Sequence, residues 1–184
     1  MSPVAAFTRV SEPPLADELE AVFREHSRLV YRTAYSVTAS AQDAEDVVQG
    51  LFMQLLCRGF PPDFQRNPKG YLYRAAVNRA LNAVKSRQRQ ASVVDAARRE
   101  GAFETAAAVE GADQNADLQT RLVAAMAQLN PRAVEMLVLR YEHDTSEAEI
   151  GRLLGTSRAV VAVTLFRARA RLKKLLRASA GETR

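Results

Sequence analysis

The chain has 184 residues and a mass of 20.3 kDa, so it holds one ordinary domain or two small ones. Its 26 Lys and Arg against 21 Asp and Glu give a formal net charge of +5 and a sequence pI near 9.7, which favours an anionic partner. A single cysteine excludes an internal disulfide, and two histidines far apart in the sequence argue against a metal or cofactor site. No apolar run is long enough to span a membrane, so we expect a cytoplasmic protein.

The N-terminal half carries two stretches in which apolar residues recur at helical spacing. The first comprises Leu19, Val22, Phe23, Leu29, Val30, Ala34 and Val37, and the second comprises Ala44, Val47, Val48, Leu51, Phe52, Leu55 and Leu56. Between them, Ser40 and Asp43 have the pattern of an N-cap and a first-turn acid. Cys57 follows the second stretch, and we expect it to be a small buried side chain. A loop with Gly59, Pro61, Pro62 and Pro68 comes next, and a third helix is predicted from about Gly70 to Gln90.

Residues 91–116 differ in composition from both sides, because they are rich in Ala, carry several acids and have few large apolar side chains. Helical spacing resumes with Leu118, Leu122, Ala125, Met126 and Leu129. Asn130 and Pro131 then predict the start of a helix whose inward residues are Val134, Leu137, Val138 and Tyr141. No stretch alternates with a period of two. We therefore expect an all-α fold of two small helical domains, 15–90 and 117–178, joined by an acidic, Ala-rich, flexible linker at 91–116.

The stretch from Thr145 to Arg177 has the pattern of a helix-turn-helix bundle. Ser146 and Glu149 form a capping box before a short helix, Gly155 ends that helix, and Ser157 caps the next one. The second helix has no acid between 158 and 177, and its cations are Arg158, Arg167, Arg169, Arg171, Lys173, Lys174 and Arg177. Such a helix favours insertion into a DNA major groove, although a solvated basic face at the edge of a bundle has the same pattern.

The third predicted helix and the loop before it combine aromatic with basic residues. The aromatics are Phe60, Phe64, Tyr71 and Tyr73, and the cations are Arg58, Arg66, Lys69, Arg74, Arg79, Lys85, Arg87 and Arg89. Flat rings beside cations suit the unstacked bases and the backbone of single-stranded nucleic acid. Asn78 and Asn82 share one helix face, and their amides can recognise base edges. The alternative is core packing of the rings with solvation of the cations, and for any single aromatic it is the better interpretation.

The second predicted helix has an acidic face opposite its apolar stripe, formed by Asp43, Glu45, Asp46 and Gln49. This face either serves solubility or docks on a basic protein partner, since charge complementarity sets register and association rate.

Three segments carry a resemblance to a known family, namely VYRTAYSVTASAQDAEDVVQGLFMQL, GYLYRAAVNRALNAVKSRQRQ and LNPRAVEMLVLRYEHDTSEAEIGRLLGTSRAVVAVTLFRARARLKKLL. They resemble the extracytoplasmic-function (ECF) group of bacterial RNA polymerase sigma factors, and the resemblance covers most of 19–90 and 118–177. It implies a promoter-specificity subunit whose partners are bacterial core RNA polymerase and promoter DNA. Members of this group are often held by an anti-sigma factor.

The resemblance also implies roles for individual residues. Polymerase docking falls to Asp43, Asp46 and Gln49. Binding and opening of the −10 element falls to Phe64, Tyr71, Arg74, Asn78, Asn82 and Lys85, with the loop 61–70 as the pocket for a flipped base. Binding of the −35 duplex falls to Arg140, Arg158, Phe166, Arg167 and Arg169. The linker would thread the RNA path of the polymerase.

Three features depart from the pattern of that group. Gly50 stands where an acid usually follows the glutamine of the docking helix, and it costs about 0.5–1 kcal/mol of helix propensity. The chain has no Trp, and Cys57 and Tyr71 occupy places where tryptophans are common. Residues 162–164 are Ala, Val and Thr where basic and hydroxyl side chains are common, so the set of base-recognising residues is unusual.

Other functions fit the sequence less well. A one-component helix-turn-helix regulator, acting on duplex DNA without polymerase, leaves the aromatic and basic N-terminal half unexplained. A sigma-mimicking adaptor normally carries a receiver domain, for which these 184 residues leave no room. An enzyme is not expected, because there is no nucleophile–base pair, phosphate-binding glycine loop or metal set. We also expect the acidic linker to compete with DNA, so neutralising Glu100, Glu104 and Glu110 should strengthen DNA binding by the free protein.

Overall fold

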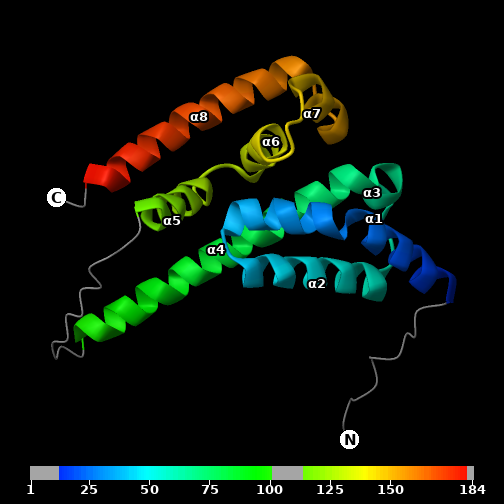
Figure 1. The fold of residues 1–184 in the computed structure, drawn as a ribbon, viewed down its shortest axis with the longest axis horizontal. Coiled ribbons are helices and arrows are strands. Elements are labelled where there is room, and N and C mark those ends of the chain that lie inside the picture. The colour runs from blue at the N-terminus through cyan, green and yellow to red at the C-terminus, as the bar shows by residue number, and fades with distance from the viewer. Residues whose placement is uncertain (1–12, 101–113, 182–184) are drawn as a thin grey trace, which may run out of the picture.

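A computed structural model of the chain describes residues 13–100 and 114–181 (Figure 1). This part of the chain folds into eight α-helices and contains no strand, which confirms the expected all-α fold. The helices are α1 (Pro13–Thr38), α2 (Ala41–Arg58), α3 (Pro62–Arg66), α4 (Pro68–Glu100), α5 (Gln114–Met126), α6 (Pro131–Tyr141), α7 (Glu147–Leu154) and α8 (Arg158–Gly181).

Helices α1, α2 and α4 pack together in the N-terminal half around a shared apolar core. Val30, Leu55 and Leu81, one from each helix, are at most 2% exposed. The predicted cap of α2 is confirmed, because Ser40 Oγ accepts a hydrogen bond from the Asp43 N–H at 3.2 Å. Apolar stripes at helical spacing thus meet in the interior, and their burial is the main source of stability for this half.

Helix α6 lies at the centre of the C-terminal half. Every residue from Ala133 to Leu139 is buried, because α6 packs against α4, α7 and α8 at once. Asn130 caps it as predicted and accepts from the Arg132 N–H at 2.8 Å. The inward placement of Tyr141 is wrong: the residue is 62% exposed, since it lies in the last turn and its hydroxyl accepts from Arg169 at the surface.

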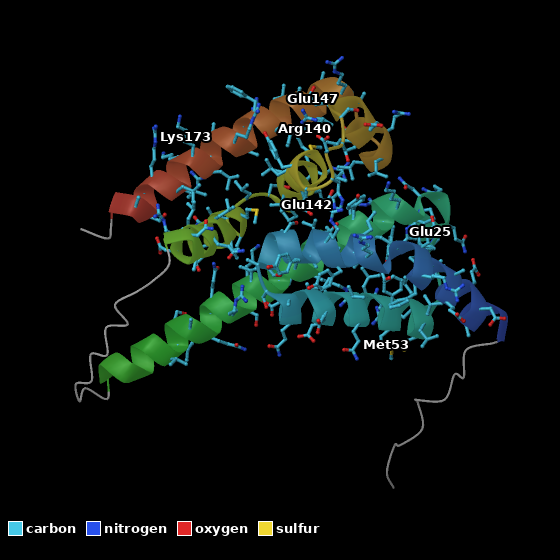
Figure 2. All side chains as sticks on the ribbon, in the orientation of Figure 1. Glu25, Met53, Arg140, Glu142, Glu147 and Lys173 are labelled. Carbon is cyan, nitrogen blue, oxygen red and sulfur yellow. The ribbon has the colours of Figure 1, made fainter. Side chains whose placement is uncertain are left out.

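The two halves of the chain pack against each other. In Figure 1, α5 to α8 lie on one side and α1 to α4 on the other, and α6 and α7 both contact α4. One apolar core contains Leu72 of α4 and Leu139 of α6, and both are fully buried. At its edge the Arg32 guanidinium donates to the Glu142 carboxylate at 2.8 Å, and Figure 2 shows Glu142 between α6 and α1. The predicted pair of helical units is therefore joined by direct contact in this structure.

Helix α4 ends at Glu100, whereas the sequence predicted its end near Gln90. Residues 91–100 contain neither Gly nor Pro and are rich in Ala and Arg, which favour helix without tertiary support. Val93 and Val94 are 67% and 49% exposed, and the ribbon of α4 extends away from the bundle there (Figure 1). The first part of the predicted linker is thus helical. The remainder up to residue 113, with Glu104 and Glu110, lies outside the described residues, as does the side chain of Glu100.

Cys57 is exposed, so the expectation that it is buried is wrong. The apolar stripe of α2 runs through Val47, Leu51 and Leu55, all buried. Cys57 lies two positions beyond Leu55, about 200° around the helix. It therefore points to solvent, and its proximity in sequence to the stripe was misleading.

Candidate nucleic-acid interface

One exposed face of α4 carries the polar residues that the sequence singled out there. Arg74, Asn78, Asn82 and Lys85 fall within a sector of about 80° at 3.6 residues per turn. Asn78, Asn82 and Lys85 are exposed, while Arg74 is half-buried and its Nε lies 3.4 Å from the Gly70 carbonyl oxygen. The arrangement offers two amides flanked by two cations in one row, which suits base edges between neutralised phosphates.

The aromatic residues beside this row have different accessibilities. Phe64 is only 4% exposed and stacks on Phe60 with ring centroids 4.6 Å apart, so the prediction that Phe64 contacts DNA conflicts with its burial. Phe64 also forms a T-shaped contact with Tyr71, with ring centroids 5.7 Å apart. Tyr73 is 2% exposed and belongs to the core. Phe60 and Tyr71 are both half-buried, so among these aromatics only these two rings are accessible to a base.

Tyr71 lines a pocket of about 460 Å³ at the end of α2. The lining residues are Gln54, Leu55, Arg58, Gly59, Pro61, Pro62, Asp63 and Tyr71. The segment predicted as loop 61–70 is instead mostly helical, since it contains the short α3 and the first turn of α4. The pocket therefore has rigid walls from three helices, with an aromatic ring and the Arg58 cation at its border.

The acidic face of α2 divides into a free part and a paired part. Glu45, Asp46 and Gln49 are exposed. Asp43 instead accepts from Arg87 of α4 at 2.6 Å, and its side chain is 24% exposed. The interface predicted to include Asp43 therefore contains a carboxylate that already has a cation inside the fold.

An apolar groove of about 400 Å³ borders Gln49 between α1 and α2. Phe23 and Met53 line it and are 45% and 50% exposed, and Figure 2 shows Met53 on the side of α2 turned away from the other helices. The apolar spacing predicted Phe23 as part of the core stripe, and it did not single out Met53. The sequence does contain a sign of its exposure, since Met53 lies outside the apolar stripe of α2. A large apolar residue at such a position has no core neighbour to cover it and can indicate an interaction surface.

Gly50 leaves room for a cation at this surface. A Cβ on Gly50 would lie 3.1 Å from Nη1 of Arg79, whose Nη2 donates to the Gln54 side chain. Arg79 thus occupies the space in which the acid usual at this position would stand. A cation therefore borders the position at which the resemblance implied an acid.

The helix-turn-helix predicted in the C-terminal half is confirmed in its local geometry. Ser146 and Glu149 form the capping box, and hydrogen bonds from Ser146 lower the pKa of Glu149. Gly155 ends α7 with φ at 65°, the left-handed conformation that glycine adopts without strain. Ser157 then caps α8 by accepting from the Val160 N–H at 3.2 Å. These contacts fix the angle at which α8 leaves the turn.

The predicted duplex-binding residues occupy different positions on this unit. Arg158, Phe166, Arg167 and Arg169 are exposed on α8, and the Arg158 Nε lies 3.6 Å from the Glu147 carboxylate. Figure 2 shows Lys173 on the outer edge of α8, pointing away from the other helices. Arg140 is half-buried and donates to the Thr145 carbonyl at 3.3 Å, so it holds the connection between α6 and α7. The exposed cations of α8 are placed at the surface, where phosphates can reach them.

Burial is the largest cause of the pKa shift at three titratable groups, Tyr73, Glu135 and His143. Burial raises the pKa of Tyr73 to about 12, against a smaller lowering by Arg32. Burial also raises the pKa of Glu135, which the hydrogen bond and charge of Arg132 oppose. Burial and then Arg32 lower the pKa of His143. The rings of Tyr73 and His143 contact each other, with centroids 5.1 Å apart, whereas Glu135 is paired with Arg132.

Within residues 13–100 and 114–181, no three His, Cys, Asp or Glu side chains come together as a metal site. None of the helices in that same part of the chain is long and apolar enough to cross a membrane.

Comparison with known proteins gives consistent matches. Residues 22–90 match the family Sigma-70 region 2, and residues 119–172 match Sigma-70, region 4. The chain is 27% identical over 188 residues to the ECF RNA polymerase sigma factor SigE of Mycolicibacterium smegmatis, covering 97% of this chain and 69% of that protein. It is 26% identical over 157 residues to the ECF RNA polymerase sigma factor SigM of Bacillus subtilis, covering 85% of this chain and 94% of that protein. A solved structure, the sigma factor RpoE in complex with the anti-sigma factor NepR from Bartonella quintana, aligns with a TM-score of 0.48 and 21% identity, covering 88% of this chain and 98% of that one.

Proposed function

The chain belongs to the extracytoplasmic-function group of bacterial sigma-70 factors, and we infer that it binds core RNA polymerase, recognises the −35 and −10 promoter elements and promotes DNA opening. The region 2 match falls on α1 to α4 and the region 4 match on α5 to α8. The observation that carries the inference is the exposed row of Asn78, Asn82 and Lys85 on the first unit, together with the capped, cationic α8 on the second.

The −10 element is proposed to meet α4 as a single strand. Asn78 and Asn82 would contact base edges, while Arg74 and Lys85 would neutralise the flanking phosphates. A base flipped into the pocket lined by Tyr71 would recover about 1–3 kcal/mol by stacking, which offsets an unstacking cost of a few kcal/mol. Phe64 would help to position the Tyr71 ring through their T-shaped contact. No covalent bond in the DNA needs to break, so binding energy can supply the cost of unpairing and unstacking the bases.

Core polymerase is proposed to dock on α2. Asp46 and Gln49 supply exposed polar contacts, and the groove lined by Phe23 and Met53 supplies adjacent apolar area. An apolar centre with a polar rim is the usual composition of a protein interface. Asp43 contributes by fixing the first turn of α2 to Arg87 rather than by direct contact.

The −35 duplex is proposed to lie against α8. Arg158, Phe166, Arg167 and Arg169 are exposed there, and phosphate contacts of this kind make affinity salt-dependent. Arg140 would act through the α6–α7 connection that it holds. The functional units remain 15–90 and 117–178 with a linker at 91–116, and its helical start at 91–100 lengthens the rigid part of the first unit.

Several further points belong to the same proposal. The protein acts in the cytoplasm, where promoter DNA is found, and it works as a non-catalytic subunit without a metal or cofactor. An anti-sigma factor remains a proposed partner. A protein of this kind gains full promoter affinity only in the polymerase complex, because a net charge of +5 supplies few phosphate contacts by itself.

Binding to purified core polymerase tests the docking part of the proposal. Replacing Asp46→Asn and Gln49→Ala together should weaken binding about tenfold, since two polar contacts at a rim are lost. Asp17→Asn removes an exposed carboxylate near the start of α1 and should leave the affinity unchanged. A chain that binds no core polymerase, yet binds duplex DNA tightly by itself, would be a one-component regulator instead.

A further inference from the structure

The outer ridge of α8 is apolar. Ala159, Val163, Phe166 and Ala170 are all exposed, and their spacing of four, three and four residues places them in one row. The opposite side of α8 carries the buried residues Val161, Leu165 and Ala168, about half a turn away. The ridge is therefore the part of α8 that faces directly away from the body of the protein.

The exposure of this ridge is large for apolar side chains. Val163 is 48% exposed and Phe166 is 68% exposed, and Val160 beside the ridge is 50% exposed. Single exposed apolar residues are ordinary, but several in one row mark a surface that is covered by a partner. The residues of α8 that are buried in the fold are Val161, Leu165 and Ala168, and none of the row is among them.

Charge identifies the occupant as nucleic acid. Cations border the ridge on both sides, and α8 contains no acid at all. The exposed cations are Arg158, Arg167, Arg169, Arg171, Lys173, Lys174 and Arg177. An apolar row between two cationic borders matches a major groove between two phosphate backbones. Val160 and Val163 lie in the first two turns after the Gly155 turn, where the second helix of such a unit meets base edges.

Resting on the proposed function, we propose that Val160 and Val163, together with Phe166, recognise thymine methyl groups in the −35 duplex. A valine side chain has no hydrogen-bond donor or acceptor, so it cannot distinguish bases by their polar edges. The thymine C5-methyl is the apolar feature of the major groove, and apolar side chains contact it. Val163, which is one of the positions where the resemblance implies a basic or hydroxyl side chain, is thus used here for a different chemical feature of the DNA.

Uracil substitution tests the proposal without altering the protein. The full chain with core polymerase is first used to select binding sequences from a random duplex library. Thymines in the upstream selected block are then replaced by uracil one at a time, which removes only the methyl group. At one or more positions the affinity should fall about fourfold, the value expected for one buried methyl.

Matched variants assign the effect to the ridge. Val163→Ser should abolish the difference between thymine and uracil at its position, and Val160→Ser should do so at a neighbouring one. Val94→Ser is the control, because Val94 on α4 has almost the same exposure, 49% against 48%. The thymine inference would be overturned if every thymine in the upstream block could be replaced by uracil without loss of affinity. It would also be overturned if the selected upstream block contained no A·T pair. Neither result would contradict the proposed sigma-factor function. Selection of no sequence at all would contradict the proposed function itself.

Discussion

The side-chain amide of Asn67 donates a hydrogen bond to the main-chain carbonyl of Leu153 at 2.7 Å. This contact joins the corner between α3 and α4 to the last turn of α7, whose carbonyls have no partner within the helix. The same Asn67 accepts from the Gly70 N–H at 2.9 Å and so caps α4. One side chain therefore orders the start of the proposed −10 helix and holds the helix-turn-helix unit against it.

Gly70 is required at this junction by space. A Cβ there would lie 2.7 Å from the Leu153 carbonyl oxygen and 2.5 Å from the Asn67 amide nitrogen, so backbone must move. We expect Gly70→Ala to separate the two halves. Dyes on the exposed Cys57 and on a cysteine introduced by Ala178→Cys should show a lower transfer efficiency in this variant. Gly181→Ala, with nothing within 4 Å of its added Cβ, is the control, and equal efficiency in both variants would contradict the packing described.

His143 makes the packing between the two halves of the chain sensitive to pH. Its Nε2 lies 3.1 Å from the Thr33 hydroxyl, and its ring meets Tyr73 edge-on at 5.1 Å. Burial lowers the pKa of His143 most, Arg32 and Lys69 lower it further, and Glu142 opposes them. His143 lines a surface pocket together with Lys69 and Tyr73, and the other titratable groups that line this pocket are Asp144, Glu149 and Arg152.

The lowered pKa of His143 sets the sign of the effect. The unfolded chain takes up the proton first as pH falls, so the contribution of His143 to stability is present above the unfolded pKa and is lost as pH drops through the folded one. The free energy of unfolding should therefore decrease more between pH 7.5 and 5.5 in the wild type than in His143→Gln. Denaturant titrations at the two pH values measure this difference, and identical losses in both proteins would show that His143 is not the responsible group.

Gly50 costs stability within α2. Gly50→Ala should raise the free energy of unfolding by about 0.5–1 kcal/mol, because alanine loses less backbone entropy in a helix. The new Cβ meets only the far end of Arg79, a flexible side chain that can shift. Gly59→Ala is the contrasting control: its φ of 74° disfavours any Cβ, so about 1–3 kcal/mol should be lost. A destabilised Gly50→Ala variant would mean that the contact between Arg79 and Gln54 matters more than helix propensity.

Phe64 and Tyr71 should respond differently to substitution. Phe64→Ala should lower the free energy of unfolding by about 3–5 kcal/mol, as expected for a buried ring. Phe64→Leu keeps most of the volume and should retain promoter opening. Tyr71→Ala should leave a folded protein whose opening is weakened by about 1–3 kcal/mol, the contribution of one stacked base. Normal opening by Tyr71→Ala would remove this ring from the proposed pocket.

Local features of the fold could be predicted because neighbouring residues determine them. The caps at Ser40, Asn130 and Ser146 and the turn at Gly155 follow from side chains that satisfy backbone groups a few residues away. The unpaired face of α4 at Asn78 was predictable for the same reason, since helical spacing alone places it opposite the core.

Features that depend on distant segments could not be predicted. Asn67 and Leu153 are 86 residues apart, and nothing in the sequence around either residue indicates that the two are in contact. Phe64 is buried because Phe60 and Tyr71 close over it, and Asp43 is paired because α4 brings Arg87 to α2. Residue type predicts that an aromatic ring or a carboxylate can contact DNA or polymerase. Only the packed structure shows which of these side chains already have partners inside the fold.

Promoter opening is the most direct test of the central claim that this chain is a sigma factor. Purified protein and core polymerase are mixed with a promoter carrying a fluorescent adenine analogue in the −10 element, whose emission rises as the base unstacks. Emission should rise only with both proteins present, and Asn78→Ala should slow it at least about fivefold. Gln90→Ala, an exposed amide about 120° around α4 from Asn78, should match the wild type. Duplex binding by the chain alone, with no opening when polymerase is added, would contradict the account.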